Sequence, residues 1–253
     1  MATAVIVVGP AGSGKSRLTG AYKKWLIEVQ GAAAAAANLD PAAEYVPYDP
    51  DYDVRKLVDA HEIAKTYGLG PNGALVKSME ILAEHAEDVA AELASLGAEY
   101  VIVDTPGQME VFLFRSISWK LTEALAASFQ RIAAIFVMDA TVVRDPADYA
   151  TLLLLSTAVQ LRLGIDVAPA LNKVDAAGEE LVAGDVYRDL ARLRRRLAAS
   201  QNLYSEMLRD LVKRLAFYSK RVNVPRVSAA TGKGMEELHR LVLEMSCACG
   251  DLS

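Results

Sequence analysis

Short apolar runs alternate with longer stretches of helical periodicity along this chain. The apolar runs, rich in Val and Ile, fall at residues 4–8, 100–104, 132–139, 167–171 and 225–228. Runs that are continuously apolar rather than alternating are typical of strands buried on both faces of a parallel sheet. An alanine-rich run at residues 32–39 is assigned to a further strand only by its position between the first helix and an Asp-Pro break, because alanine favours helices.

Helical patterns fill the segments between these runs. Residues 75–96 carry apolar side chains on one face and end at Gly97, a natural helix terminator. Further helices are predicted at residues 186–197, where Asp185 can cap the first turn, and at residues 203–219. Strands alternating with helices predict right-handed β-α-β units, and hence an α/β fold with a mostly parallel sheet flanked by helices.

The composition narrows the class of protein to a globular domain. With 53% apolar and 23% charged residues, the chain differs from disordered, collagen-like and disulfide-rich proteins. Since there is no Gly/Ser-rich linker or internal repeat, residues 1–253 are expected to form a single domain with a short loose tail at 246–253. The formal net charge of −5 disfavours direct binding of nucleic acid.

Two observations bear on the compartment. The apolar runs at residues 32–37 and 152–155 are shorter than the ~20 residues that a membrane span needs, so no membrane partner is expected. The only cysteines are Cys247 and Cys249, to which no role is assigned, and no leader sequence is recognised. We therefore expect a cytoplasmic protein.

The segment after the first apolar run carries the strongest motif in the chain. It reads Gly-Pro-Ala-Gly-Ser-Gly-Lys-Ser and matches G-x-x-x-x-G-K-[ST], the phosphate-binding P-loop. In that motif backbone N–H groups surround the β-phosphate, the lysine spans the β- and γ-phosphate oxygens, and the serine hydroxyl ligates Mg²⁺. The predicted strand before it and helix after it disfavour a merely glycine-rich turn. The predicted nucleotide-binding residues here are Gly9, Pro10, Ala11, Gly12, Ser13, Gly14, Lys15, Ser16 and Arg17.

An acidic residue ends the apolar run at residues 100–104. A carboxylate at the end of a neighbouring strand is where a P-loop protein holds Mg²⁺ through its water shell, so Asp104 and Ser16 are the predicted metal ligands. The N–H of Gly107 is predicted to sense a γ-phosphate. Gln108 stands where a water-orienting glutamine stands in many GTPases. The alternative, an ordinary strand and turn, is disfavoured because the stretch follows a P-loop in the chain.

A four-residue motif after the run at residues 167–171 indicates the base. In Asn172-Lys173-Val174-Asp175, the Asp175 carboxylate can accept from N1–H and the exocyclic amine of guanine, which adenine cannot supply. The stem of Lys173 can pack over the base plane. Coming after the two phosphate motifs, Asn172, Lys173 and Asp175 predict a guanine nucleotide. The triplet Ser228, Ala229 and Ala230 matches the short loop whose backbone N–H contacts the guanine oxygen, although its composition says little alone.

Two further segments carry candidate chemistry beside plainer alternatives. Asp40, followed by a proline, is placed at the carboxyl edge of the sheet, where ligands of open α/β folds bind; the alternative is a turn or helix cap. Residues 68–73 form a tight loop of glycines and a proline ahead of a helix that starts near Leu75. Asn72 within it can simply be a turn residue.

The order of these motifs resembles that of one known family. With Asp40-Pro41, then the triplet Gly70, Pro71 and Asn72, then residues 104–108 and 172–175, the chain is similar to the GPN-loop GTPases over residues 5–243. The resemblance implies a three-layer P-loop NTPase fold of the dimerising class, GTP hydrolysis with Mg²⁺, a homodimer, and a GPN loop that reaches the partner's nucleotide. The compact length is more like that of an archaeal member. Eukaryotic members are implicated in RNA polymerase assembly, and that role is here only an analogy.

Two positions depart from related dimeric ATPases. Pro10 stands where those proteins often carry a lysine that reaches across the dimer, which disfavours the partitioning and arsenite-pump ATPases. Arg17 stands where a second hydroxyl is frequent, but Ser16 suffices as the metal ligand. In place of the missing cation, Asn72 is predicted to donate its amide to a phosphate oxygen in trans. The predicted catalytic residues are Lys15, Asp40, Asn72 and Gln108.

Two functions fit this sequence. One is a slow GTPase switch whose open and closed dimers present different surfaces to a protein client. The other is a nucleotide-gated binding module or chaperone in which hydrolysis only resets client binding. A kinase is disfavoured because the chain lacks a recognisable acceptor site. The apolar residues 111–125 are expected to pack in the core, with a client groove as the alternative.

Overall fold

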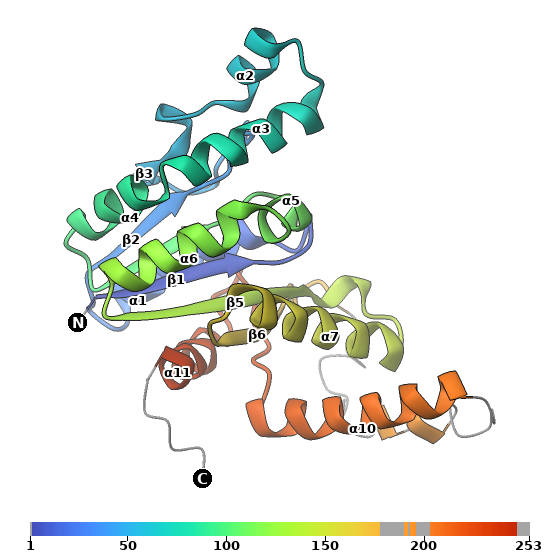
Figure 1. Ribbon diagram of the computed structural model, residues 1–253. Helices are drawn as coiled ribbons and strands as arrows, with labels where there is room; N and C mark the ends of the chain where they lie inside the picture. Colours follow the sequence, from blue (N-terminus) through green and yellow to red (C-terminus); the bar gives the residue numbers. More distant parts are fainter. Residues whose placement is uncertain (1, 178–189, 192, 196–202, 247–253) are drawn as a thin grey trace.

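A six-stranded parallel sheet forms the centre of the molecule (Figure 1). The computed structural model describes residues 2–177, 190–191, 193–195 and 203–246. The strand order is β3-β2-β4-β1-β5-β6, and every pair of neighbours is parallel. The strands are β1 (Thr3–Val8), β2 (Ala34–Asn38), β3 (Tyr52–Asp53), β4 (Tyr100–Asp104), β5 (Arg131–Asp139) and β6 (Val167–Asn172). The predicted α/β fold with a parallel sheet is therefore confirmed.

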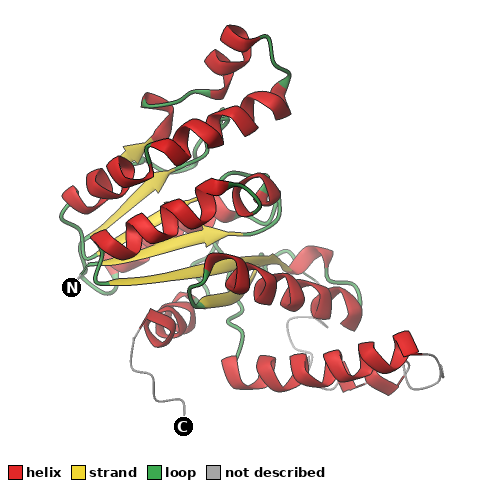
Figure 2. Cartoon of the chain, viewed as in Figure 1, coloured by secondary structure: helices red, strands yellow, loops and turns green. Residues whose placement is uncertain are grey.

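Helices cover both faces of this sheet and make three layers (Figure 2). Alternate residues of β1 point to opposite faces: Val5 and Val7 join the apolar cluster under α1 (Lys15–Glu28) and α11 (Met235–Ser246), whereas Ile6 and Val8 join the larger cluster on the other face. The other α-helices whose bounds the described residues give are α2 (Ala60–Tyr67), α3 (Pro71–Glu84), α4 (Ala86–Ser95), α5 (Met109–Leu113), α6 (Ser116–Ser128), α7 (Pro146–Leu163) and α10 (Leu203–Val222).

The structure confirms some of the predicted elements and contradicts others. The strand within the alanine run is confirmed as β2, and the helix from Leu203 is confirmed as α10. The single helix at residues 75–96 is wrong, because His85 leaves helical geometry (φ −105°, ψ 17°) and divides the segment into α3 and α4. A break of one residue does not disturb the apolar periodicity on which the expectation was based.

The strand expected at residues 225–228 is also wrong. The segment meets the sheet only through an isolated bridge between Leu171 and Arg226, after which the N–H of Ser228 turns back to the carbonyl of Lys233. The segment is apolar because it is buried beside the end of β6, and it does not form a further strand of the sheet.

Some of the expected features lie in parts of the chain that the structure does not describe. The helix expected at 186–197, with Asp185 as its cap, lies largely outside the described residues, and Cys247 and Cys249 lie outside them as well. The short strand β3 and helix α2 were not anticipated from the sequence. Among the helices that the structure describes, none is both long and apolar enough to span a bilayer.

Candidate functional site at the carboxyl edge of the sheet

The motifs converge on the edge of the sheet where the strands end. The P-loop follows β1, Asp40 follows β2 by two positions, Asp104 is the last residue of β4, and Asn172 is the last residue of β6. In a parallel sheet the carboxyl ends of neighbouring strands lie at one edge, the usual ligand site of open α/β folds. Segments far apart in the sequence are thereby brought to one place.

The P-loop needs glycine at two positions for identifiable reasons. A Cβ at Gly9 would lie 2.5 Å from the carbonyl oxygen of Val137 on β5. Gly14 caps α1 with a left-handed backbone (φ 91°), and a Cβ there would lie 2.7 Å from Nδ2 of Asn172. Only glycine tolerates such a φ at low cost. The loop therefore packs closely on β5 and on the predicted guanine motif.

Lys15 is almost fully buried, with 5% of its surface exposed. Its Nζ donates to the carbonyl oxygens of Gly9 (2.9 Å), Pro10 (3.1 Å) and Gly107 (3.3 Å). Burial lowers the pKa of Lys15, while the nearby carboxylates of Asp104 and Asp40 act in the opposite direction. The ammonium thus lies between the P-loop and the segment that follows β4, where it can meet phosphate oxygens.

Asp104 is the most deeply buried carboxylate of the site, with 2% of its surface exposed. Burial raises its pKa to about 6, although hydrogen bonds from Ser16 and Tyr48 favour the ionised form. Tyr48 Oη donates to Asp104 Oδ2 at 3.1 Å, whereas the buried Oδ1 has no hydrogen-bond partner in the described structure. A buried carboxylate oxygen without a donor is a free ligand position.

This arrangement fits Mg²⁺ bound together with a nucleotide. Mg²⁺ usually takes one or two carboxylates and keeps its remaining positions for waters and substrate phosphates. The described residues contain no group of three or more His, Cys, Asp and Glu side chains that could hold a metal by themselves. Asp104 and Ser16 therefore fit the predicted ligand pair.

Asp40 lies just after β2 at the carboxyl edge of the sheet, and it also caps a turn. Its Oδ1 accepts from the N–H of Ala42 at 3.0 Å, which is the turn cap, and its Oδ2 accepts from the N–H of Gly107 at 3.0 Å. That N–H is the group predicted to sense a γ-phosphate. Gly107 thus joins the site twice, since its carbonyl accepts from Lys15 and its N–H donates to Asp40.

The GPN triplet is not a loop ahead of a helix but the start of α3. Gly70 is the N-cap, Pro71 occupies the first turn, and all three residues are exposed. Pro suits this turn because it has no N–H to lose. Asn72 Oδ1 accepts from Nε2 of Gln108 in the same chain at 3.3 Å, so two predicted catalytic residues lie together.

On the guanine side, Asn172 ties two loops together. Its side chain is buried; Nδ2 donates to the carbonyl of Ser13 in the P-loop (3.0 Å), and Oδ1 accepts from the N–H of Ala229 (3.2 Å). One amide therefore fixes the distance between the phosphate loop and the segment of Ser228, Ala229 and Ala230. Both hydrogen-bonding groups of the Asn172 side chain are thus bonded to backbone groups of these two loops.

Lys173 lies along the P-loop in an uncommon backbone conformation (φ 63°). Its Nζ donates to the carbonyl of Gly12 and forms an ion pair with Asp139 at 2.7 Å. Asp139 ends β5 and was not predicted as a site residue, because no motif surrounds it. Asp175 is exposed.

The apolar residues 111–125 divide into two sets. Most are buried as expected: Phe112, Leu113, Ile117, Leu121 and Leu125. Phe114 and Trp119, in contrast, are 69% and 43% exposed. The core interpretation holds for the first set only.

Comparison with known proteins identifies the family of this chain. A family model described as "Conserved hypothetical ATP binding protein" matches residues 7–248. GPN-loop GTPase PAB0955 of Pyrococcus abyssi is 35% identical over 253 residues, which cover 98% of this chain and 99% of that protein. The chain belongs to the GPN-loop GTPase family. The crystal structure described as PAB0955, a GTPase in apo form, superimposes with a TM-score of 0.82 at 33% identity and 98% coverage of both chains.

More distant relatives in the GPN-loop GTPase family are longer. GPN-loop GTPase 1 of Dictyostelium discoideum is 30% identical over 235 residues, which are 92% of this chain but 59% of that protein. Two residues of the site were missed by sequence reasoning, Tyr48 beside Asp104 and Asp139 beside Lys173, because neither lies in a recognisable motif.

Proposed function

We propose that the chain hydrolyses GTP to GDP and phosphate with Mg²⁺ and works as a homodimeric nucleotide switch. The observation that carries the proposal is that Lys15 and Asp40 both hydrogen-bond to the backbone of Gly107, beside the buried Asp104 carboxylate. A cation, a metal-ligating carboxylate, an N–H donor and a candidate water-positioning carboxylate then surround one point. Phosphoryl transfer requires such positioned charges more than covalent chemistry.

Each residue has a separate task in this proposal. Lys15 and the P-loop amides hold the β- and γ-phosphates, and Ser16 and Asp104 hold Mg²⁺, which neutralises phosphate charge when it is bound. Asp40 and Gln108 orient a water molecule whose oxygen attacks the γ-phosphorus. The bond to the β–γ bridging oxygen breaks, GDP leaves, and the proton of the water passes to the released phosphate.

The Asp40–Gly107 hydrogen bond implies an exchange of partners on nucleotide binding. When the γ-phosphate accepts from the Gly107 N–H, the Asp40 Oδ2 loses that donor and is free to accept from water. The same N–H thus serves Asp40 before GTP arrives and the phosphate afterwards. GDP, which has no γ-phosphate, leaves the Asp40 contact intact.

Phosphate release measured with GTP tests the proposal. The wild type should release phosphate with Mg²⁺ and stop in EDTA, whereas Gln108→Ala should bind GTP with unchanged affinity and turn over at least about tenfold more slowly. Asp40→Ala separates the two water-positioning candidates. Hydrolysis by Asp40→Ala at the wild-type rate would remove Asp40 from the mechanism, and a wild type without GTPase activity would overturn the proposed function.

Guanine is the proposed base despite the family model's description. The description names ATP, but Asp175 has only acceptor oxygens, and adenine lacks the two donors that guanine presents to them. Isothermal titration with GTP and with ATP decides between the two. Equal affinities would refute the guanine assignment.

The homodimer and the trans role of Asn72 belong to the same proposal. Because Asn72 is exposed at the first turn of α3 and contacts Gln108, it can serve either its own site or a partner's. Mixing Asn72→Ala with Lys15→Ala protein pairs one intact P-loop with one intact Asn72 in a mixed dimer. Recovered hydrolysis supports action in trans, whereas no recovery in demonstrated mixed dimers confines Asn72 to its own chain.

A nucleotide-gated binding module is the second candidate, and the exposed aromatics favour it. Phe114 and Trp119 are exposed and follow Gly107 and Gln108 in the chain. A backbone shift at Gly107 on binding of the γ-phosphate can therefore change their position. In the switch proposal the client is a protein under assembly, such as RNA polymerase, whereas in the module hydrolysis only resets client binding. A client whose binding is lost in Phe114→Ser, with GTP turnover unchanged, supports the module; nucleotide-independent binding contradicts it.

A further inference from the structure

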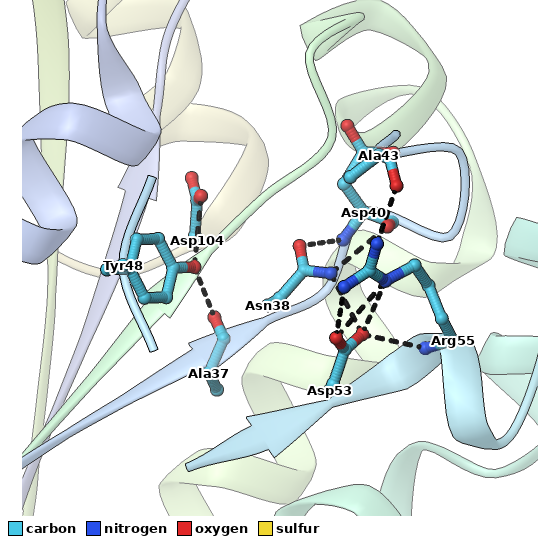
Figure 3. Close-up of polar contacts among 8 residues, drawn as sticks. All are labelled: Ala37, Asn38, Asp40, Ala43, Tyr48, Asp53, Arg55 and Asp104. Atoms are coloured by element: carbon cyan, nitrogen blue, oxygen red, sulfur yellow. Dashed lines mark hydrogen bonds and ion pairs between the residues drawn. The ribbon is translucent and has the colours of Figure 1, made fainter. Parts of the chain in front are cut away.

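A cluster of three polar side chains joins β2 to the edge strand β3, next to Asp40. Figure 3 shows Asn38 at the end of β2, Asp53 at the end of β3, and Arg55 just after β3. None of these residues was assigned a role above. All three point toward the turn that begins at Asp40.

Each nitrogen of the Arg55 guanidinium donates at least one hydrogen bond. Its Nε donates to Asp53 Oδ1 (2.9 Å) and Oδ2 (3.1 Å), its Nη2 donates to Asp53 Oδ2, and its Nη1 donates to the carbonyl of Ala43 (2.8 Å). Such a fork is specific to arginine, because lysine presents a single nitrogen. With every nitrogen occupied, Arg55 is not poised as an arginine finger toward phosphate.

Asp53, which binds Arg55, also accepts a hydrogen bond from Asn38. Asp53 Oδ1 accepts from Asn38 Nδ2 at 3.0 Å, and the Asp53 and Arg55 side chains are 12% and 29% exposed. The hydrogen bond from Arg55 is the largest cause that lowers the pKa of Asp53, so the carboxylate stays ionised and keeps accepting.

Asn38 in turn holds the backbone of Asp40 on both sides. Asn38 Oδ1 accepts from the Asp40 N–H (3.1 Å), and Nδ2 donates to the Asp40 carbonyl (3.3 Å). Arg55 also reaches the far side of the same turn through Ala43, whose own N–H donates to the Asp40 carbonyl at 3.3 Å. The peptide groups around Asp40 are therefore fixed from two directions. Among the described residues, its carboxylate accepts hydrogen bonds from two backbone amides, those of Ala42 and Gly107.

We infer that Arg55 is a positioning residue for hydrolysis: through Asp53 and Asn38 it fixes the Asp40 backbone, so that only the Asp40 side chain turns when GTP takes the Gly107 N–H. The inference rests on the proposed role of Asp40. A carboxylate on a fixed backbone approaches the water in one geometry, and misplacement by about 1 Å costs up to about 100-fold in rate.

The test compares Arg55→Met with Lys23→Met. Methionine keeps an unbranched stem and removes the donors. Lys23 forms an ion pair with Asp51 (2.6 Å) on the same connecting segment, and is a matched control. Arg55→Met should lower kcat about 10- to 100-fold, with the affinity for a non-hydrolysable GTP analogue changed less than about threefold, and Lys23→Met should retain wild-type kcat.

Adding Asp40→Ala shows whether Arg55 acts through Asp40. In an Asp40→Ala background, Arg55→Met should lower kcat by less than about twofold, because its target is gone. An equal loss in both backgrounds, or a loss of GTP affinity that accounts for the change, overturns the inference. A wild type without GTPase activity would instead refute the proposed function.

Hydrogen exchange gives a readout that needs no activity. The N–H groups of Asp40, Ala42 and Gly107 should exchange at least about tenfold faster in Arg55→Met than in the wild type, and unchanged exchange overturns the inference. If Arg55→Met fails to fold because Asp53 is left unpaired, the double variant Asp53→Asn/Arg55→Met removes both charges and should fold. A folded double variant with wild-type kcat also overturns the inference.

Discussion

On the phosphate side of the site, Lys15 and Asp104 keep only 5% and 2% of their surface exposed, whereas on the guanine side Asp175 is exposed and Lys173 is half-buried. The phosphate side holds charges inside the protein, where they act strongly on one another and on a ligand but are costly without one. The raised pKa of Asp104 and the lowered pKa of Lys15 show that cost. On the guanine side a neutral amide, Asn172, ties the loops together, and the Asp175 carboxylate is exposed to water. The two sides should therefore respond differently to substitution.

The largest effect is expected from Asp104→Ala. Removing the carboxylate that fits Mg²⁺ should lower GTP turnover by at least about 100-fold and abolish the dependence of GTP affinity on Mg²⁺. Titration of a fluorescent GTP analogue with and without Mg²⁺ measures the second effect. Tighter binding with Mg²⁺ in Asp104→Ala would show that the metal is held elsewhere.

The next effect concerns the stability of the nucleotide-free protein. The folded pKa of Asp104, about 6, lies above its ordinary value of 3.8, so ionisation destabilises the folded state above pH 6 and has no effect where the group is protonated in both states. At neutral pH, Asp104→Asn should therefore raise the free energy of unfolding by about 2–3 kcal/mol. The gain should fade as the pH falls from 6 to 4, as urea denaturation at a series of pH values would show. A gain that is constant with pH would contradict this origin.

Asp175→Asn should act on the base alone. The new amide turns a donor toward the donors of guanine, so GTP affinity should fall about 10- to 100-fold and xanthine nucleotides should bind better. Folding stability should not change, because Asp175 is exposed. Calorimetric titration with both nucleotides measures the exchange, and a loss of affinity shared by xanthine nucleotides would argue against a base contact.

The smallest effect is expected from Asn172→Ala, which should lower the stability of the phosphate side and the guanine side together. It leaves the Ser13 carbonyl and the Ala229 N–H without their partner, which should cost about 1–2 kcal/mol of unfolding free energy. Gln160→Ala, which removes an exposed amide bound to Asp166, is the control and should cost less than about 0.5 kcal/mol. Equal values for the two variants would mean that Asn172 is not a structural tie.

The sequence determined the elements whose signals are local. Continuous Val and Ile runs specify buried strands, so β1, β4, β5 and β6 followed from pattern alone. The P-loop glycines and the order of the motifs were likewise sufficient to indicate the family, because each motif depends on residues adjacent in the chain. The family membership and the parallel α/β sheet are confirmed; the roles of the individual site residues stay predictions.

Only the tertiary structure decided how these motifs contact one another. The hydrogen bond between Asp40 and Gly107 joins the segments that follow β2 and β4, and the contact of Asn72 with Gln108 depends on where α3 begins. Tyr48 and Arg55 carry no motif, because their importance comes from partners distant in sequence or from a network that β3 completes at the sheet edge. Propensity and periodicity describe one segment at a time, whereas a hydrogen bond between loops exists only after the strands have aligned their carboxyl ends.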